Sequence, residues 1–276
     1  MPTIAFLGAG NIAQAIMGGL IASTQQTSGS SEPGKGMTVT TYDPVEVCTE
    51  KAAKLGAEVK DTNANAIRDA DIVMLCVKPD VLIDLLRELA SECREGQLFV
   101  SVAAGITCAS MKAVMPDNTA IVRCMPNTPA LVKVGMTGMY ASDTVTVKQK
   151  QAAQTVMAAV GETLWVTEES DLDAVTAVSG SGPAYYFLMM ELMIKAAIEE
   201  GLEPSVAKKL VLQTALGAAT MASASLIDPA ALRLNVTSPG GTTQAALEHF
   251  NDKGLGAIVS GAVNAARVRS VEMSKQ

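Results

Sequence analysis

Short apolar runs alternate with helical patterns over the first 165 residues. The apolar runs predict strands, at Thr3–Leu7, Thr38–Tyr42, Ile72–Val77, Leu98–Val102 and Ala120–Met125. Helical periodicity predicts helices between the earlier strands, at Ile12–Ser23, Pro44–Leu55 and Asp80–Cys93. Strands that alternate with helices form parallel βαβ units. We therefore expect residues 1–165 to form an α/β domain with a parallel sheet.

The pattern becomes entirely helical after Val166, and no strand pattern remains. Helices are predicted at Asp171–Val178, Ala184–Glu200, Ser205–Ser225, Pro229–Asn235, Thr243–Phe250 and Leu255–Met273. Residues 166–276 are therefore expected to form a second, all-helical domain. Every position of Ala184–Met190 is apolar, and a helix that is apolar all round must be covered on all sides. A domain of this size cannot cover it alone, so a partner subunit is expected.

Composition narrows the class of protein. The chain has 276 residues, 49% of them apolar and 18% charged, which predicts a folded protein of two domains. A net charge of −7 lacks the basic footprint of a nucleic-acid-binding protein. No basic, apolar leader and no uninterrupted apolar run of membrane-spanning length occur, so we expect a cytoplasmic protein without a membrane contact. The segment Thr27–Gly36 is rich in Gly and Ser and predicts a flexible surface insertion.

Cysteine and histidine usage excludes several chemistries. The five cysteines form no CxxC pair, and we interpret them as reduced thiols that pack in the interior. His249 is the one histidine, which removes His-dependent catalytic triads and most zinc sites, so no metal is expected. His249 itself fits a plain surface position.

A dinucleotide fingerprint follows the first predicted strand. Residues 8–13 read GAGNIA, the GxGxxA version, placed between a strand and a helix at the start of a βαβ series. Gly8 allows the tight turn, Gly10 lets a pyrophosphate approach the backbone, and Ala13 lets helix and strand pack closely. The helix N-terminus offers free N–H groups to the phosphates. This context predicts a bound nicotinamide or flavin dinucleotide.

The second strand ends at Asp43. An acidic residue there holds the ribose 2′-hydroxyl and disfavours a 2′-phosphate, so Asp43 favours NADH over NADPH. The alternative is that Asp43 caps the helix predicted from Pro44, and both roles are compatible. Lys78 and Val102–Gly105 follow the next strands, where ligands of such sheets bind. For Lys78, a solvated loop charge is the alternative.

Two further motifs begin helices in the second half. Ser179–Pro183 (SGSGP) opens the long apolar helix, and its small residues permit close backbone approach, either for a ligand or for helix packing. Asn235–Thr243 (NVTSPGGTT) opens another helix. Its Gly-Gly-Thr-Thr run exposes several N–H groups and is suited to a carboxylate, with an ordinary helix cap as the alternative.

With these motifs the sequence resembles the pyrroline-5-carboxylate reductase family over nearly its whole length. The matching segments are Phe6–Ala13, Val77–Pro79, Val102–Ile106, Arg123–Pro129, Asp173–Tyr185 and Asn235–Thr243. The resemblance implies a Rossmann dinucleotide-binding domain followed by a helical dimerisation domain. It further implies a homodimer that assembles into a decamer.

The resemblance also implies site residues. Those implied to line the cofactor, NADPH or NADH, are Leu7, Gly8, Ala9, Gly10, Asn11, Ile12, Asn63, Cys76, Val77, Lys78, Pro79, Val102, Ala103, Ala104 and Asn235, to which the strand argument adds Asp43. Those implied to line the substrate pocket are Glu169, Ser238, Gly241, Thr242 and Thr243. Asp43 departs from many relatives, which have a small polar or basic-flanked residue there.

The implied reaction is hydride transfer to the imine carbon of 1-pyrroline-5-carboxylate, which gives L-proline. The protein would position and polarise the substrate, with the Thr243 hydroxyl bonded to the ring nitrogen and acting as the catalytic group. Two alternatives stay open. A β-hydroxyacid dehydrogenase-like enzyme would need a lysine where this chain has Gly-Ser-Gly-Pro, and a non-catalytic dinucleotide-binding sensor would not turn over.

Overall fold

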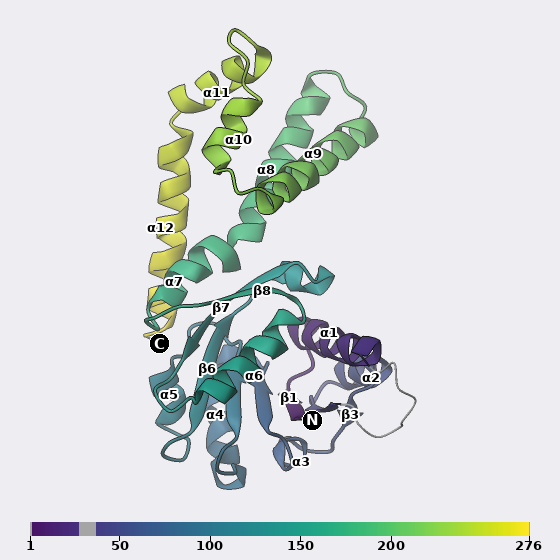
Figure 1. Cartoon of the computed structure of the whole chain (residues 1–276), viewed down its shortest axis with the longest axis vertical. Helices are drawn as coiled ribbons and strands as arrows, with labels where there is room; N and C mark the ends of the chain where they lie inside the picture. The colour runs from purple at the N-terminus through teal and green to yellow at the C-terminus, as the bar shows by residue number, and fades with distance from the viewer. Residues whose placement is uncertain (1, 28–36, 276) are drawn as a thin grey trace. The chain divides into compact units, whose positions relative to one another are not determined.

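The computed structural model describes residues 2–27 and 37–275, so most of the Gly/Ser segment expected to form an insertion lies outside the described residues. The chain divides into two compact units, Met1–Ser181 with Ala266–Gln276, and Gly182–Ala265 (Figure 1). The expected domain boundary after residue 165 stays a prediction. The contacts divide the chain after Ser181 and join the last residues to the first unit.

The first unit is built on one sheet with the strand order β3-β2-β1-β4-β5-β6-β7-β8. Its strands are β1 (Thr3–Leu7), β2 (Thr38–Tyr42), β3 (Glu58–Val59), β4 (Ile72–Leu75), β5 (Leu98–Ser101), β6 (Ala120–Met125), β7 (Gly135–Ala141) and β8 (Gly161–Trp165). All neighbours are parallel except β6 and β7. The order from β3 to β6 is that of dinucleotide-binding α/β folds. The expected α/β Rossmann class is confirmed.

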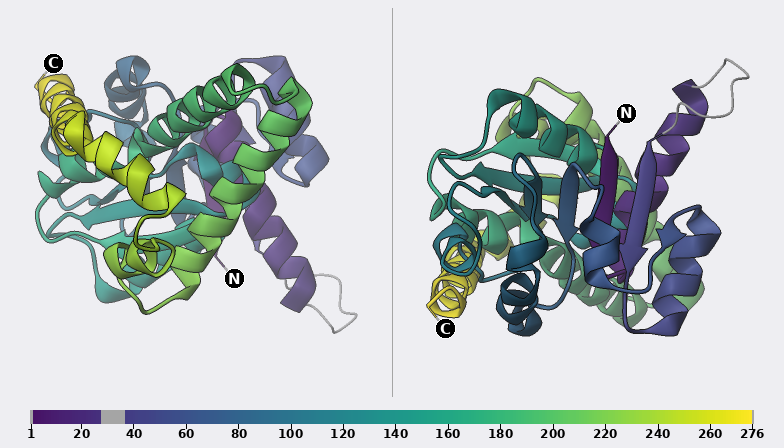
Figure 2. Two further views of the ribbon diagram at one scale, coloured as in Figure 1. Left: turned by 90° about the horizontal axis from the view of Figure 1, so that it is seen from above. Right: turned by 90° about the horizontal axis from the view of Figure 1, so that it is seen from below.

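Helices cover both faces of this sheet (Figure 2). They are α1 (Asn11–Thr27), α2 (Glu46–Leu55), α3 (Asn63–Ile67), α4 (Pro79–Leu89), α5 (Cys108–Lys112), α6 (Val147–Ala158) and α7 (Asp171–Val175), with short turns at Ala90–Glu92, Thr128–Val132 and Thr176–Gly180. Alternate strand residues enter opposite cores. Ile4 and Phe6 pack with α1 and α6, whereas Ala5 and Leu7 pack with α3 and α4. Both faces are buried, which explains the continuous apolar strands.

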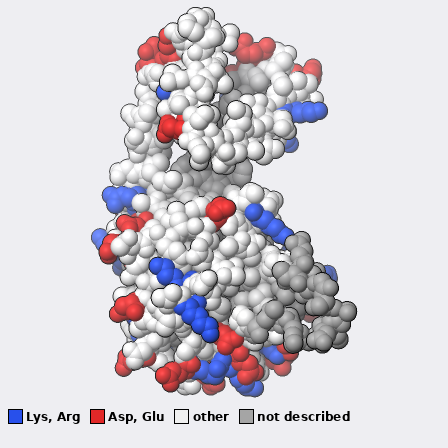
Figure 3. Space-filling view, in the orientation of Figure 1, with Lys and Arg blue, Asp and Glu red and all other residues white. Residues whose placement is uncertain are grey.

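The second unit is all-helical, as expected. It contains α8 (Gly182–Glu199), α9 (Pro204–Ala224), α10 (Pro229–Asn235), α11 (Thr242–Asp252) and most of α12 (Leu255–Met273). Large apolar side chains of this unit are exposed, among them Phe187 at 62%, Leu188 at 54% and Leu216 at 61%. The face of this unit seen in Figure 3 is mostly uncharged. Among the described helices, none has the length and apolar character to cross a membrane.

Three strands and three helices of the first unit carry too weak a pattern to predict. β3 has two residues, β7 is interrupted by Gly135 and Gly138, and β8 has no fully buried residue. Gly138 is required by packing, because a Cβ there would lie 2.6 Å from Val175. Helices α3 and α5 are five residues long, and α6 is polar on most positions. Helix α2 begins at Glu46 rather than at Pro44.

Candidate functional site

The expected cofactor residues of the first unit lie along one edge of the sheet. Leu7 ends β1, and the others follow the carboxyl end of one of the parallel strands β1 to β5, where ligands of such sheets bind. They are Leu7, Gly8, Ala9, Gly10, Asn11, Ile12, Asp43, Asn63, Cys76, Val77, Lys78, Pro79, Val102, Ala103 and Ala104. Lys78 is exposed and precedes the first turn of α4. The remaining expected cofactor residue, Asn235, ends α10 in the other unit.

Gly8 makes the tight turn between β1 and α1. Its φ is +91°, and a Cβ would lie 2.8 Å from the carbonyl oxygen of Cys76. Its N–H donates to the Tyr42 carbonyl at 2.9 Å, so the turn is held between the ends of β2 and β4. A side chain at this position would strain the backbone and push apart two neighbouring strands.

The start of α1 leaves room for a phosphate. A Cβ built on Gly10 meets no protein atom within 4 Å, so the backbone is open to a close ligand there. Helix α1 has no acidic residue in its own first turn, which leaves the N–H groups there to a phosphate. Ala13 behind it is fully buried, as close packing of helix on strand requires. These features fit the pyrophosphate of a dinucleotide.

Asp43 is fixed against this turn by both carboxylate oxygens. Oδ2 accepts from the Ala9 N–H at 2.7 Å, and Oδ1 accepts from the Val45 N–H at 2.8 Å. Asp43 therefore does not cap α2 directly, since that helix has Val45 at its N-cap, but it orders the turn that leads into it. Residues 43–50 contain Asp43, Glu46 and Glu50 and no lysine or arginine.

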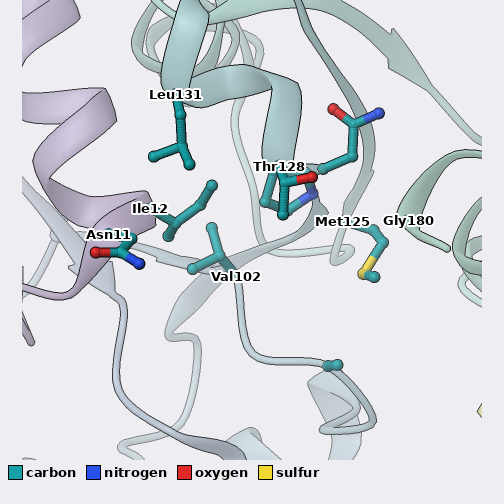
Figure 4. A pocket seen from close by; sticks show the side chains of 10 residues that line it. Asn11, Ile12, Val102, Met125, Thr128, Leu131 and Gly180 are labelled. Carbon is teal, nitrogen blue, oxygen red and sulfur yellow. The ribbon is translucent and has the colours of Figure 1, made fainter. Parts of the chain in front are cut away.

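A cavity of about 300 Å³ opens beside the start of α1. It is lined by Asn11, Ile12, Val102, Ala104, Met125, Pro126, Asn127, Thr128, Leu131 and Gly180. Figure 4 shows the Leu131 and Val102 side chains pointing toward Ile12 from opposite sides. The lining is mainly apolar with a few polar side chains, which is typical of a small-molecule site.

Several of these lining residues had no site role in the sequence prediction. Met125 ends β6, and Pro126, Asn127 and Thr128 follow it; Gly180 belongs to the SGSGP motif. The segments that contain them, Arg123–Pro129 and Asp173–Tyr185, were matched to the family in the sequence, but no site role was predicted for these residues. Residues 125–128 lie at the carboxyl end of a sheet strand, on the same edge as Val102. This position is the signal that could have identified them.

The cysteines at this edge are not nucleophiles. Burial raises the pKa of the Cys76 thiol to about 12. Burial, and then the Glu169 carboxylate, raise the pKa of the Cys108 thiol to about 12. Burial also raises the pKa of the Cys124 thiol. A protonated thiol is a poor nucleophile, so these side chains contribute packing.

Glu169 forms a half-buried ion pair. Its Oε1 accepts from Arg123 Nη1 at 3.0 Å and from the Cys108 N–H at 2.8 Å. The Arg123 side chain is only 7% exposed. One carboxylate oxygen thus ties the loop before α7 to β6 and to the start of α5. The expected substrate role of Glu169 stays a prediction.

Glu169→Ala should lower the free energy of unfolding by about 3 kcal/mol, because it leaves the buried Arg123 guanidinium without a counter-charge. Glu168→Ala is the control, since that neighbouring side chain is exposed and a surface change costs at most about 0.5 kcal/mol. Urea unfolding followed by fluorescence of Trp165, the single tryptophan, measures both. Equal losses in the two variants would show that the ion pair contributes nothing.

The expected substrate residues of the second unit gather at the start of α11. Gly241 is its N-cap, and Thr242 and Thr243 are its first residues. The first helical bond runs from the Ala245 N–H to the Gly241 carbonyl, so the N–H groups of residues 242–244 precede the helical ladder. Among the described residues, the hydroxyls of Thr242 and Thr243 have no hydrogen-bond partner, and no side chain caps the helix.

Close packing shapes the same turn. A Cβ on Gly241 would lie 2.5 Å from the Ser238 hydroxyl, so only glycine fits there without displacing that side chain. The Gly240 N–H donates to Gln244 Oε1 at 2.7 Å and closes the turn over the helix start. The result is an ordered set of donors suited to an anion.

Over residues 2–27 and 37–275, no group of three His, Cys, Asp or Glu side chains could hold a metal ion.

Comparison with known proteins covers both halves of the chain. A family model described as pyrroline-5-carboxylate reductase dimerisation matches residues 169–273, and one described as NADP oxidoreductase, coenzyme F420-dependent, matches residues 3–105. The pyrroline-5-carboxylate reductase of Pseudomonas aeruginosa is 45% identical over 277 residues, which cover 100% of this chain and 98% of that protein.

Solved structures agree over the full length. The pyrroline-5-carboxylate reductase of Coxiella burnetii matches with a TM-score of 0.91 at 36% identity, covering 100% of this chain and 99% of that one. The Plasmodium falciparum pyrroline carboxylate reductase, solved with NADP bound, matches with a TM-score of 0.82 at 27% identity, covering 99% and 98%.

Proposed function

Because this chain belongs to the pyrroline-5-carboxylate reductase family, we propose that it reduces 1-pyrroline-5-carboxylate to L-proline, the last step of proline synthesis. The observation that carries the proposal is the 45% identity to a curated reductase over the whole length of both chains. The two site motifs, GAGNIA in one unit and SPGGTT in the other, are intact.

When bound, the reduced nicotinamide dinucleotide, NADH or NADPH, supplies a hydride to the imine carbon. The turn at Gly8 and Gly10 and the start of α1 would bind its pyrophosphate, and the carboxyl ends of β2 to β5 would hold the rest. The apolar cavity beside Ile12 and Val102 would exclude water from the nicotinamide end. These roles rest on the open space at Gly10 and on the position of the cavity along the same edge.

The N–H groups that begin α11 would bind the substrate carboxylate, and the Thr243 hydroxyl would bond the ring nitrogen. Ser238, Gly241 and Thr242 would shape the same pocket. A protonated imine is already electrophilic, so the hydride completes the secondary amine without a further acid. The protein's contribution is then orientation and charge stabilisation.

A homodimer follows from the family, whose dimerisation region matches residues 169–273. We further propose that dimers assemble into a decamer, which sedimentation of the purified protein would test. Five free cysteines fit the reducing cytoplasm, where we propose that the enzyme acts. We propose no nucleic-acid partner, in keeping with the net charge of −7.

We predict that the enzyme uses NADH at least as well as NADPH. The Asp43 carboxylate is fixed by two N–H groups and would face a 2′-phosphate with a like charge. Asp43→Ser should therefore shift the ratio of kcat/KM values toward NADPH by roughly tenfold, which is about 1.4 kcal/mol. Asp69→Ser is the control, because Asp69 is exposed and precedes β4 at the opposite edge of the sheet. A strong wild-type preference for NADPH would contradict this role of Asp43.

Turnover separates the proposed function from its two alternatives. The purified chain should oxidise NADH only when the cyclic imine is present, and proline should accumulate in equal amount. A dinucleotide-binding sensor would bind NADH without turnover, and a β-hydroxyacid dehydrogenase-like enzyme would oxidise hydroxy acids instead. Either result would contradict the proposal.

A further inference from the structure

Asn127 joins three segments that meet at the apolar cavity. Its Oδ1 accepts from the Met136 N–H at 2.8 Å, at the start of β7. Its Nδ2 donates to the Ser179 carbonyl at 3.2 Å and lies 3.3 Å from the Ser179 hydroxyl. Asn127 itself lines the cavity and is half-buried. Only one orientation of the amide satisfies both an N–H donor on one side and a carbonyl acceptor on the other.

The Ser179 carbonyl belongs to a widened helical turn. Residues Thr176–Gly180 form a π-helix, in which the Ser181 N–H donates to the Thr176 carbonyl at 2.8 Å. An α-helical bond to the Ser179 carbonyl would come from residue 183, which is a proline without an N–H. The Asn127 amide supplies a donor in its place. Single π-turns of this kind are frequent at functional sites.

This turn forms part of the cavity wall, and it is closely packed there. A Cβ on Gly180 would lie 2.6 Å from the Cε atom of Met125, another lining residue. A movement of the π-turn at Gly180 would therefore displace the end of the Met125 side chain and change the cavity wall. The Asn127 amide donates hydrogen bonds from the segment after β6 to Ser179 of this π-turn.

We infer that Asn127 is a positioning residue for hydride transfer, because it fixes the π-turn against the segment after β6 and so sets the shape of the cavity in which the reacting atoms would meet. The inference rests on the proposed function. Asn127 would not touch the transferred hydride and would not bind the pyrophosphate. Its loss should therefore slow the chemical step and leave dinucleotide affinity within about twofold of wild type.

Asn127→Asp provides the sharpest test, because the side chains have the same shape. A charged carboxylate still accepts from the Met136 N–H but repels the Ser179 carbonyl, whereas a protonated carboxyl can donate to it. Half-burial and the facing Ser179 carbonyl should raise the pKa of the introduced carboxyl above its ordinary value of about 3.9. The ratio of variant to wild-type kcat/KM should therefore be about 0.1 or lower near pH 8 and should rise as the pH is lowered toward about 5 and the carboxyl becomes protonated. Asn127→Leu should be slow at both pH values.

Ser179→Ala is the matched control, since it removes one hydroxyl contact and keeps the carbonyl acceptor; it should stay within about threefold of wild type. Hydrogen exchange of the free protein gives a readout that does not depend on turnover. In Asn127→Leu, peptides covering residues 136 and 176–181 should exchange faster, with peptides of β1 and β2 unchanged. A pH-independent ratio for Asn127→Asp, or unchanged exchange in Asn127→Leu, would overturn the inference. If wild type fails to reduce the imine, the proposed function falls, while the exchange result still decides whether Asn127 holds the turn.

Discussion

Leu188→Asp should leave the protein monomeric and with little turnover. Leu188 is 54% exposed in one chain and lies in a helix whose neighbours Tyr186 and Phe187 are also exposed. Because residues 169–273 match a dimerisation region, a second copy should cover this surface. An unpaired carboxylate buried in that contact would cost several kcal/mol, enough to prevent assembly at micromolar concentrations. Size-exclusion chromatography with light scattering, alongside turnover per chain, measures both effects.

Val147→Asp is the matched control for this experiment. Val147 is 86% exposed, lies outside the dimerisation match and begins α6, where an acidic side chain is favourable. This variant should assemble and turn over like wild type. A Leu188→Asp protein that remains an active oligomer would place the subunit contact elsewhere on the helical unit.

Thr243→Val should lower kcat/KM for the imine by roughly ten- to a hundredfold. Valine keeps the shape of the side chain and removes the hydroxyl proposed to bond the ring nitrogen. A hydrogen bond to a charged group is worth about 1.5–3 kcal/mol, which corresponds to that loss. Dinucleotide affinity should be unchanged, and carboxylate binding should partly survive because the N–H groups of α11 remain.

The competing explanation is that Thr243 only packs at the helix start. In that case Thr243→Val would lower the melting temperature and keep the turnover of each folded molecule. Thr220→Val is the control, because the Thr220 hydroxyl donates to the Leu216 carbonyl within its own helix, α9. Unchanged kinetics with a lowered melting temperature would remove Thr243 from the active site and leave the backbone donors alone.

The strands that bury both faces were predictable from sequence, and the later ones were not. β1, β2 and β6 have the expected bounds, and most of their residues are buried on both sides of the sheet. β7 and β8 lie at the end of the sheet, where glycines and exposed positions break the pattern. The π-turn at Thr176–Gly180 overlaps the end of the plain helix predicted at Asp171–Val178, because widened turns have no composition signal of their own.

Part of the candidate site was likewise predictable from the sequence, and part was not. The Gly-rich turn and Asp43 were predictable, since their chemistry follows from position relative to strand ends. The Asn127 hydrogen bonds were not, because their partners lie nine and 52 positions away. The ion pair of Glu169 with Arg123 likewise joins residues 46 positions apart. Contacts of that range depend on how the elements pack, which the local pattern does not specify.

As proposed, this chain delivers a hydride to the imine carbon of 1-pyrroline-5-carboxylate. Reduction with NADH carrying deuterium at the transferable C4 position, followed by mass spectrometry and NMR of the product, tests it directly. We predict L-proline with one deuterium at the ring carbon next to nitrogen that was the imine carbon. Unlabelled proline, or cofactor oxidation without proline, would contradict the account.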